Sequence, residues 1–411
     1  MRLSLSTLTL CALTTTVAAQ PTIAFTGGRW FNGRDFETRV MYTANGLFQS
    51  ERPARIDTTI DLAGGFVVPP FGEAHNHNVE GSSRTDMTLA RYIAQGIFYV
   101  MNPNSLPRSA VAVKDRVNKP NAIDVTFANG GLNVTGGHPA DLVQRNIGRG
   151  SWQADDGEGA FYHTIDDRAA LDAKWPKIVA GKPDFIKVYL LYSNEYEKRR
   201  VDTTYRDVRG LDPALVPEIV RRAHAAGLRV GAHIENVYDF RAAVGAGVDM
   251  LMHMPGYGWR GSGDSAQYVI GAADAAEAAR RRTAIITTLA FNQRASAPTR
   301  TALQIRRDDL NAANLRTLKN AGVTIAIGSD NYGATSLSEA LYLSDLGVFT
   351  NVELLRMWSE TTPALIFPRR KLGLLRDGYE ASFVVLAEDP LQNFAAVQRV
   401  SRRVKQGHLL P

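Results

Sequence analysis

Cysteine is almost absent from this chain. Cys11 is the only cysteine among 411 residues, and it lies within the first 20. If those residues are a leader that is removed, the mature chain carries no thiol. That excludes disulfide bonds and cysteine-ligated zinc, and it is compatible with an oxidising compartment.

The first segment has the pattern of a signal peptide. In "MRLSLSTLTLCALTTTVAAQ" a basic residue precedes an apolar, threonine-rich run, and the small residues Val17, Ala18 and Ala19 follow. We therefore predict a signal peptide at 1–19, a mature chain starting near Gln20, and a periplasmic or secreted protein. The apolar run is shorter than the ~20 residues of a membrane span, so no stable membrane insertion is expected after signal removal.

Long runs of one charge are also missing. The 47 basic and 41 acidic residues give a formal charge of +6, and basic residues cluster only in short groups such as 280–282. This pattern is typical of a solvated, mildly basic surface and gives no sign of a nucleic-acid partner. We expect a small-molecule substrate, and a homo-oligomer is compatible with the composition.

The two ends of the chain share one sequence pattern, short stretches typical of β-strands. Residues 22–61 contain short alternating stretches, and Asn45-Gly46 between two apolar runs predicts a hairpin. After about Leu372, "ASFVVLAED" and "VQRVSRRVKQG" again resemble short strands. We predict that 20–65 and 373–411 together form one small β-sandwich domain.

The central part alternates apolar runs with helical periodicity. This pattern predicts repeated βα units around a parallel sheet, and eight strands in order predict an α/β fold of the (β/α)8 TIM barrel type over 66–372. One helix is especially well marked, because Asp212 suits its N-cap, Pro213 its first position and Gly227 its end. The eight expected strands are "GFVVPP", "GIFYVMN", "DVTFANG", "DFIKVYLLY", "RVGAHIE", "VDMLMHM", "AIITTLA" and "TIAIGSD".

Six polar residues fall at or near the ends of five of these strands, which is where such barrels carry their chemistry. Each also has an ordinary structural explanation: a buried histidine bonded to backbone, a lysine whose ammonium reaches solvent, or an aspartate that caps a helix. The coincidence of all six favours a shared site. They are His75 and His77 after the first strand, Lys187 in the fourth, His233 in the fifth, His253 in the sixth and Asp330 in the eighth.

The set has the chemistry of a metal centre. Neutral imidazoles and a carboxylate suit zinc, with manganese, iron or cobalt as alternatives. The spacing His-x-His lets two side chains of one extended segment point the same way. A lysine ammonium cannot bind a metal, but Lys187 could do so after carboxylation by CO2, which requires the neutral amine that desolvation favours.

This arrangement resembles the metal-dependent amidohydrolase superfamily over nearly the whole mature chain. The sequence is most similar to the branch of prolidases and imidazolonepropionase-related enzymes. The motifs that carry the resemblance are "TGGHPAD", "DFIKV", "AHIENVYDFRAAVGAGVDMLMHM", "GVTIAIGSD" and "EDPLQNFAAVQRVSRRVKQG".

The resemblance implies a two-metal site. His75, His77 and Asp330 would hold one divalent ion, His233 and His253 the other, and carboxylated Lys187 would bridge them. A bridging hydroxide would be the nucleophile, with Asp330 as the proton shuttle. His138 resembles a residue near the substrate, for which binding of a carbonyl or carboxylate and an ordinary place in a turn are both open.

Two departures from the family pattern stand out. In "PPFGEAHNHN", Gly72 and Glu73 stand where the first strand normally continues, and Ser382 stands where relatives commonly carry aspartate. The serine at position 382 does not affect the metal chemistry. The Gly72-Glu73 segment makes it unsafe to transfer a substrate from relatives.

Specificity should come from the loops that follow the strands. An arginine there could pair with a substrate carboxylate, although most surface arginines serve no such purpose. The substrate-binding candidates are Tyr192, Tyr257, Arg260 and Arg294, with His138, and further loop residues in suitable places are Trp259, Asn292 and Tyr332.

We predict an exported hydrolase that cleaves an amide bond of a dipeptide or an N-acyl amino acid. A lactonase, esterase or phosphoester hydrolase on the same metal centre is an alternative. A one-metal deaminase is disfavoured, because Glu235 lies two rather than three residues after His233 and is better explained as a carboxylate behind the ligands or on the surface. A non-catalytic binding protein is disfavoured by the intact ligand set.

Overall fold

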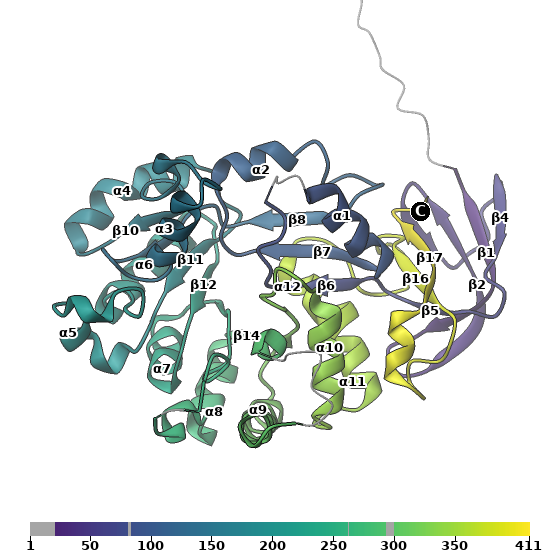
Figure 1. The fold of residues 1–411 in the computed structure, drawn as a ribbon. Helices are drawn as coiled ribbons and strands as arrows, with labels where there is room; N and C mark the ends of the chain where they lie inside the picture. Colours follow the sequence, from purple (N-terminus) through teal and green to yellow (C-terminus); the bar gives the residue numbers. More distant parts are fainter. Residues whose placement is uncertain (1–20, 81–83, 262, 293–299) are drawn as a thin grey trace, which may run out of the picture.

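The two ends of the chain build one sheet. The computed structural model describes residues 21–80, 84–261, 263–292 and 300–411, so the predicted signal peptide lies outside the described residues. The sheet has the order β18-β17-β16-β5-β1-β2-β3, with β4 paired to β1. Its N-terminal and C-terminal strands lie side by side in Figure 1. The bounds are β1 Ile23–Phe31, β2 Phe36–Ala44, β3 Leu47–Gln49, β4 Thr58–Asp61, β5 Phe66–Val68, β16 Phe383–Leu386, β17 Val400–Lys405 and β18 His408–Leu410.

Strands from both ends of the described chain share this end-built sheet, while a separate domain with two sandwich layers stays a prediction. The hairpin at Asn45-Gly46 is confirmed, because β2 and β3 pair antiparallel across it and both residues have positive φ. Buried aromatic residues fill one side of the sheet: the Phe25 and Trp30 rings lie 4.9 and 5.1 Å from that of Phe383.

The central strands are parallel. One sheet has the order β6-β7-β8 and the other the order β10-β9-β11-β12-β13-β14-β15. Hydrogen bonds join the two sheets on both sides, from Ala74 N to Ile327 O at 2.9 Å and from Asp184 N to Phe127 O at 2.8 Å. The strands are β6 Phe71–Glu73, β7 Ile97–Asn102, β8 Asp124–Phe127, β9 Gly131–Asn133, β10 Tyr162–Thr164, β11 Ile186–Tyr189, β12 Val230–His233, β13 Met250–Leu251, β14 Ala284–Ile286 and β15 Ile325–Ala326.

This α/β arrangement is consistent with the predicted (β/α)8 barrel, and helices pack around its strands (Figure 1). The marked helix forms as expected: the Asp212 carboxylate accepts from Ala214 N, a short 3₁₀ turn follows, and Gly227 has a φ of 72° beyond its end. The helices are α1 Thr85–Ala94, α2 Pro107–Val113, α3 Ala140–Gly148, α4 Arg168–Ala180, α5 Tyr196–Arg199, α6 Val216–Ala225, α7 Val237–Ala246, α8 Ala272–Arg281, α9 Ala302–Asn320, α10 Ser336–Asp345, α11 Asn351–Arg356 and α12 Thr362–Ile366.

One predicted strand was wrong in its extent. The stretch 65–70 was expected to be the first barrel strand, but Phe66–Val68 pairs with β1 and β16 in the end-built sheet. The first barrel strand is Phe71–Glu73, which pairs with β7. Pro69 and Pro70 separate the two, because a proline has no amide hydrogen to donate to a ladder. No helix in the described ranges combines the length and apolar character of a membrane span.

Candidate metal centre

The two parallel sheets bring the predicted ligands to one end of their strands. His75 and His77 follow β6, and His233 is the last residue of β12. His253 comes two residues after β13, and Asp330 lies four residues beyond β15. Lys187 lies inside β11, and its neighbour in the register is Gly231 of β12.

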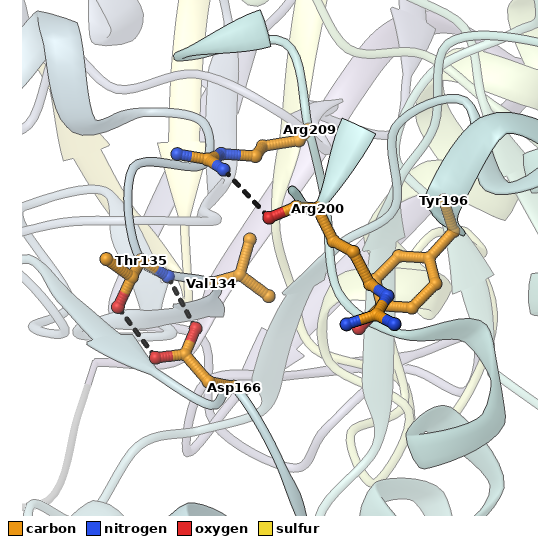
Figure 2. A pocket seen from close by; sticks show the side chains of 6 residues that line it. All are labelled: Val134, Thr135, Asp166, Tyr196, Arg200 and Arg209. Atoms are coloured by element: carbon orange, nitrogen blue, oxygen red, sulfur yellow. Dashed lines mark hydrogen bonds between the residues drawn. The ribbon is translucent and has the colours of Figure 1, made fainter. Parts of the chain in front are cut away.

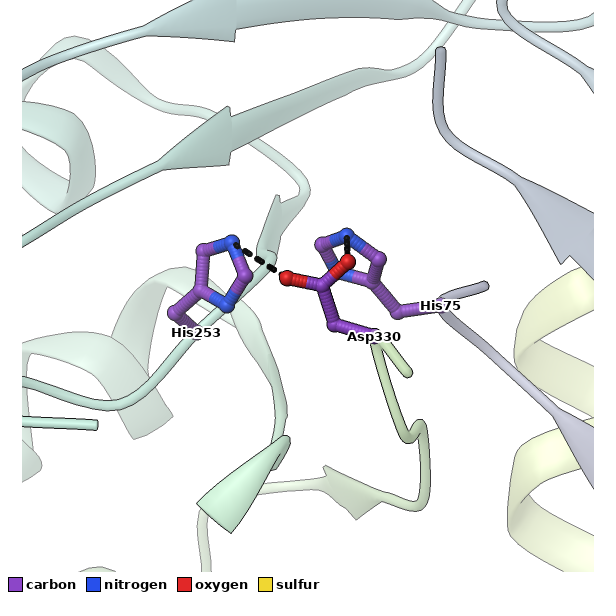
Figure 3. A group of neighbouring side chains, drawn as sticks. All are labelled: His75, His253 and Asp330. Atoms are coloured by element: carbon purple, nitrogen blue, oxygen red, sulfur yellow. Dashed lines mark ion pairs between the residues drawn. The ribbon is translucent and has the colours of Figure 1, made fainter. Parts of the chain in front are cut away.

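Asp330 lies between His75 and His253 (Figure 3). Its Oδ1 is 3.5 Å from His75 Nε2 and 3.4 Å from His77 Nε2. Its Oδ2 is 4.0 Å from His253 Nε2. Ligand atoms of His75, His253 and Asp330 all lie within 4.8 Å of one another. One carboxylate therefore faces both of the predicted metal positions.

The backbone fixes which nitrogen of each imidazole faces the centre. His75 Nδ1 is 2.7 Å from Met252 O, and His77 Nδ1 is 2.9 Å from Asn104 O. Because a carbonyl can only accept, each Nδ1 carries the proton and each Nε2 keeps a free lone pair. Burial lowers the pKa of both rings, that of His77 to about 4, so both are neutral at pH 7.

The spacing of these donor atoms fits a small divalent cation. His75 Nε2 and His77 Nε2 are 3.3 Å apart, and each lies 3.4 to 3.5 Å from Asp330 Oδ1. Tetrahedral coordination with bonds of about 2.0 to 2.1 Å places neighbouring ligand atoms roughly 3.3 to 3.4 Å apart. The three donors thus form a triangular face of the size that zinc requires.

Lys187 is buried against this group. Lys187 is 1% exposed, and its Nζ lies 5.3 Å from the Tyr189 ring centroid. Among the described residues the ammonium has no hydrogen bond or ion pair. Burial lowers the pKa of Lys187, while the nearby Asp330 carboxylate opposes that shift. The lower pKa increases the fraction of neutral amine, which is the form that reaction with CO2 needs.

His233 and His138 lie at the second position. The His233 ring is 4.5 Å from that of His253 and 5.1 Å from that of His138. The His138 Nδ1 lies 3.5 Å from Asp207 Oδ2. The prediction that His138 lies near the reacting centre therefore agrees with the geometry, and its role stays a prediction.

Glu235 is closer to the centre than the sequence indicated. Its Oε1 is 3.1 Å from His233 Nε2 and accepts from the Tyr257 hydroxyl at 3.4 Å. Burial raises the pKa of this carboxyl to about 8. The spacing His-x-Glu on an extended segment, which points both side chains to one side, was the signal that could have placed it.

The unusual Gly72-Glu73 segment belongs to the frame of the site. Both residues, whose type departs from the family pattern, lie in β6. The buried Glu73 carboxylate accepts from Ser329 N and from Ser329 Oγ, each at 2.8 Å, and so ties β6 to the residue before Asp330. A Cβ on Gly72 would lie 2.6 Å from Thr362 Cγ2, so only glycine fits there.

Glu339 supports the opposite side. Its carboxylate accepts from the backbone amides of Thr288, Leu289 and Ala290 at 3.0, 2.9 and 2.6 Å. Thr288 Oγ1 lies 2.8 Å from His253 Nδ1, so this turn orients His253.

Titration of Glu339 should make stability depend on pH. Burial raises the pKa of Glu339 in the folded protein from 4.5 to about 7. The backbone amides that donate to the carboxylate lower this pKa, but by less than burial raises it. Between pH 4.5 and about 7, Glu339 is ionised in the unfolded chain but keeps its proton in the folded protein. The free energy of unfolding therefore falls as pH rises through this range. The free energy of unfolding should drop by about 3 kcal/mol more in wild type than in Glu339→Gln from pH 4.5 to 8. Urea titrations of both proteins measure this, and parallel curves would contradict it.

Some of the predicted substrate residues lie beside histidines of the centre, and the others have different neighbours or lie outside the described residues. Tyr257 stacks on His253 with centroids 4.0 Å apart, and the exposed Tyr332 ring lies 6.0 Å from that of His77. Tyr192 is half-buried, and its ring packs 3.6 Å from the Arg199 guanidinium carbon. The other candidates are Arg260, which is exposed, Trp259, which is buried, and Arg294 and the Asn292 side chain, which lie outside the described residues.

The parallel α/β fold and the cluster of histidines around a carboxylate have the character of a metal-dependent hydrolase. Residues 187–408, more than half of the chain, match the Amidohydrolase family. The chain belongs to this family, which confirms the predicted superfamily and a hydrolase that acts on carbon–nitrogen bonds.

Curated and solved proteins agree with the family. The ochratoxinase of Aspergillus niger is 35% identical over 80 residues, which are 19% of this chain and 17% of the ochratoxinase. Among solved structures, an amidohydrolase aligns with a TM-score of 0.72 at 18% identity, covering 95% of this chain and 98% of that one. A prolidase in complex with N-methylphosphonate-L-proline gives 0.71 at 17%, covering 95% and 99%. The A. niger ochratoxinase gives 0.71 at 18%, covering 96% of each chain.

Proposed function

We propose that this protein hydrolyses the amide bond of a small molecule, with dipeptides and N-acyl amino acids as the first substrates to test. The observation that carries the proposal is the position of Asp330, whose two carboxylate oxygens face His75 and His77 on one side and His253 on the other. A carboxylate among neutral imidazoles is suited both to hold divalent cations and to move a proton.

Two divalent ions fit the donor set. His75, His77 and Asp330 would hold one, His233 and His253 the other, and carboxylated Lys187 would bridge them. When bound, the ions supply Lewis-acid activation of water and of the substrate carbonyl. Zinc is our first choice because the donors are nitrogen and oxygen atoms at tetrahedral spacing, with manganese, iron and cobalt as alternatives.

The chain's own residues supply the proton chemistry. Burial raises the pKa of Asp330, and the charge of Lys187 opposes that shift. A carboxylate poised in this way can take a proton from the attacking water and return it to the leaving amine. His138, which faces His233 and is exposed in part, is placed to donate a hydrogen bond to a substrate carbonyl or carboxylate.

The relatives support a small amide substrate without selecting one. The solved neighbours include prolidases and a Xaa-Pro dipeptidase with methionine bound in its active site. They also include molinate hydrolase and phenylurea hydrolase B, so the fold serves leaving groups of several kinds. The loops that carry Tyr192, Tyr257, Arg260 and Arg294 are where we expect the choice to be made.

We further propose that the enzyme is exported, with residues 1–19 as a signal peptide, and that a two-layer β domain from both termini accompanies a closed barrel. Secretion is tested by sequencing the N-terminus of protein recovered from the periplasm or medium. A start near Gln20 is expected.

Removal of metal should abolish hydrolysis. We expect dialysis against a chelator to lower the metal content from about two ions per chain, measured by plasma mass spectrometry, and activity to return when Zn²⁺, Mn²⁺ or Co²⁺ is added. The activity assay uses a panel of dipeptides, N-acyl amino acids and lactones. Turnover that resists chelation and metal loss, or turnover of lactones alone, would contradict the proposal.

A further inference from the structure

A cavity of about 280 Å³ lies beside the loop that carries His138 (Figure 2). This is room for about nine water molecules, or for one small organic acid. Its wall is formed by the loop after β9, by the residue two beyond β10, and by the long connection between β11 and α6. The lining residues are Val134, Thr135, Asp166, Tyr196, Arg200 and Arg209.

Arg209 is the cation of this wall that forms no ion pair with any described residue, and the Asp202 carboxylate interacts with its charge only from a distance. Within the described ranges the one hydrogen bond of its guanidinium runs from Nη1 to Arg200 O at 3.3 Å. Its Nε is buried and has no acceptor. A guanidinium has five N–H donors, and a buried donor without an acceptor costs free energy.

The other charges of the cavity are already engaged. Arg200 pairs with Glu197 through Nε at 2.6 Å. The Asp166 carboxylate accepts from Thr135 N at 2.8 Å and from Thr135 Oγ1 at 2.7 Å. Among the described residues Asp166 is bound by neutral groups only, so what Arg209 contributes is guanidinium donors without a carboxylate in contact. Val134 and Tyr196 provide apolar surface beside it.

The chain makes room for this guanidinium. Gly136 has a φ of 67°, and a Cβ at that position would lie 2.4 Å from Arg209 Nη2. Any other residue would therefore displace the arginine. The same segment is tied to the active-site loop, because His138 N donates to Arg209 O at 3.2 Å and Asp207 N donates to Gly136 O at 2.9 Å.

We propose that this cavity binds a small carboxylate, held by the Arg209 fork. Arginine binds carboxylates through two parallel hydrogen bonds, and partial burial reduces screening of the pair. The carboxylate could belong to the substrate itself or to a separate small acid. In both cases, a carboxylate bound by Arg209 would fix the segment whose backbone accepts the hydrogen bond from His138 N.

The test measures binding of sodium propionate to the purified enzyme by calorimetry, with propionamide as the neutral analogue. We expect saturable binding of propionate, weaker by about tenfold or more in Arg209→Gln, and no binding of propionamide. Arg206→Gln is the matched control, because Arg206 lies in the same connection but pairs with Asp141 at 2.6 Å. It should bind propionate as the wild type does.

Three results would overturn the proposal: no saturable binding, equal affinity in Arg209→Gln, or equal binding of propionamide. Equal affinity would place the propionate elsewhere, including at the metal centre. If Arg209→Gln does not fold, Arg209→Lys keeps the charge without the fork and should bind with lower affinity than wild type. Competitive inhibition of hydrolysis by propionate assigns the site to the substrate's own carboxylate, and non-competitive inhibition assigns it to a separate acid.

Discussion

Asp330→Asn should lower kcat/KM by about 10³-fold or more while the protein stays folded. Asparagine keeps the shape of the side chain but cannot take up the proton that a buried carboxylate accepts. It also weakens the hold on a cation between the two histidine groups, because the 3.4 and 3.5 Å contacts to His77 and His75 lose their negative charge. Steady-state hydrolysis and metal content, measured on the same preparation, separate the two effects.

The matched control is Asp345→Asn at the exposed end of α10, which should retain wild-type activity. Thermal unfolding of Asp330→Asn should occur at or above the wild-type temperature in metal-free protein, because a buried charge has been removed. An Asp330→Asn variant that keeps more than about a tenth of the activity would rule out Asp330 as the proton carrier.

Lys187→Ala should lower the metal content of the enzyme and reduce kcat/KM by about 10²-fold or more. The side chain is buried beside the predicted ligands, so its loss would remove the negative charge and the volume of the bridging group that we propose. If the working group is a carbamate, added acetate or propionate should enter the space and restore part of the activity. Hydrolysis with and without these acids, together with metal analysis, measures the effect.

The control for rescue is Asp330→Asn, which leaves Lys187 in place and should gain nothing from added acid. Because propionate is also our probe for the Arg209 cavity, the rescue is repeated in Lys187→Ala/Arg209→Gln. Full metal content in Lys187→Ala would remove the bridging role of this residue.

The order of elements could be predicted because their signals are local. The helix from Asp212 to Gly227 has its own cap, first-turn proline and terminal glycine. Asn45-Gly46 likewise specifies a hairpin through its positive φ values. The clustering of the predicted ligands could be anticipated because they lie in or shortly after parallel strands, which bring such positions together.

The rest depends on contacts between distant segments. Nothing near Glu73 in the sequence indicates that Ser329, 256 residues away, donates two hydrogen bonds to it. The apolar run looks continuous across the prolines at 69 and 70. The sequence therefore did not indicate that the chain passes there from the end-built sheet to the first parallel strand. The sequence does not single out Arg209, because a buried guanidinium nitrogen without an acceptor is a property of packing.

The sheet built from both termini has a consequence for biosynthesis. β5 pairs with β16, and the two prolines alone separate β5 from β6, which leads directly to His75 and His77. During translation β5 must wait for residues more than 300 positions later before it gains this partner. β5 pairs with β1 early, but its other edge is covered only near the end of synthesis. A nascent or truncated chain lacking β16 should therefore leave an apolar strand edge open to aggregation and chaperone capture.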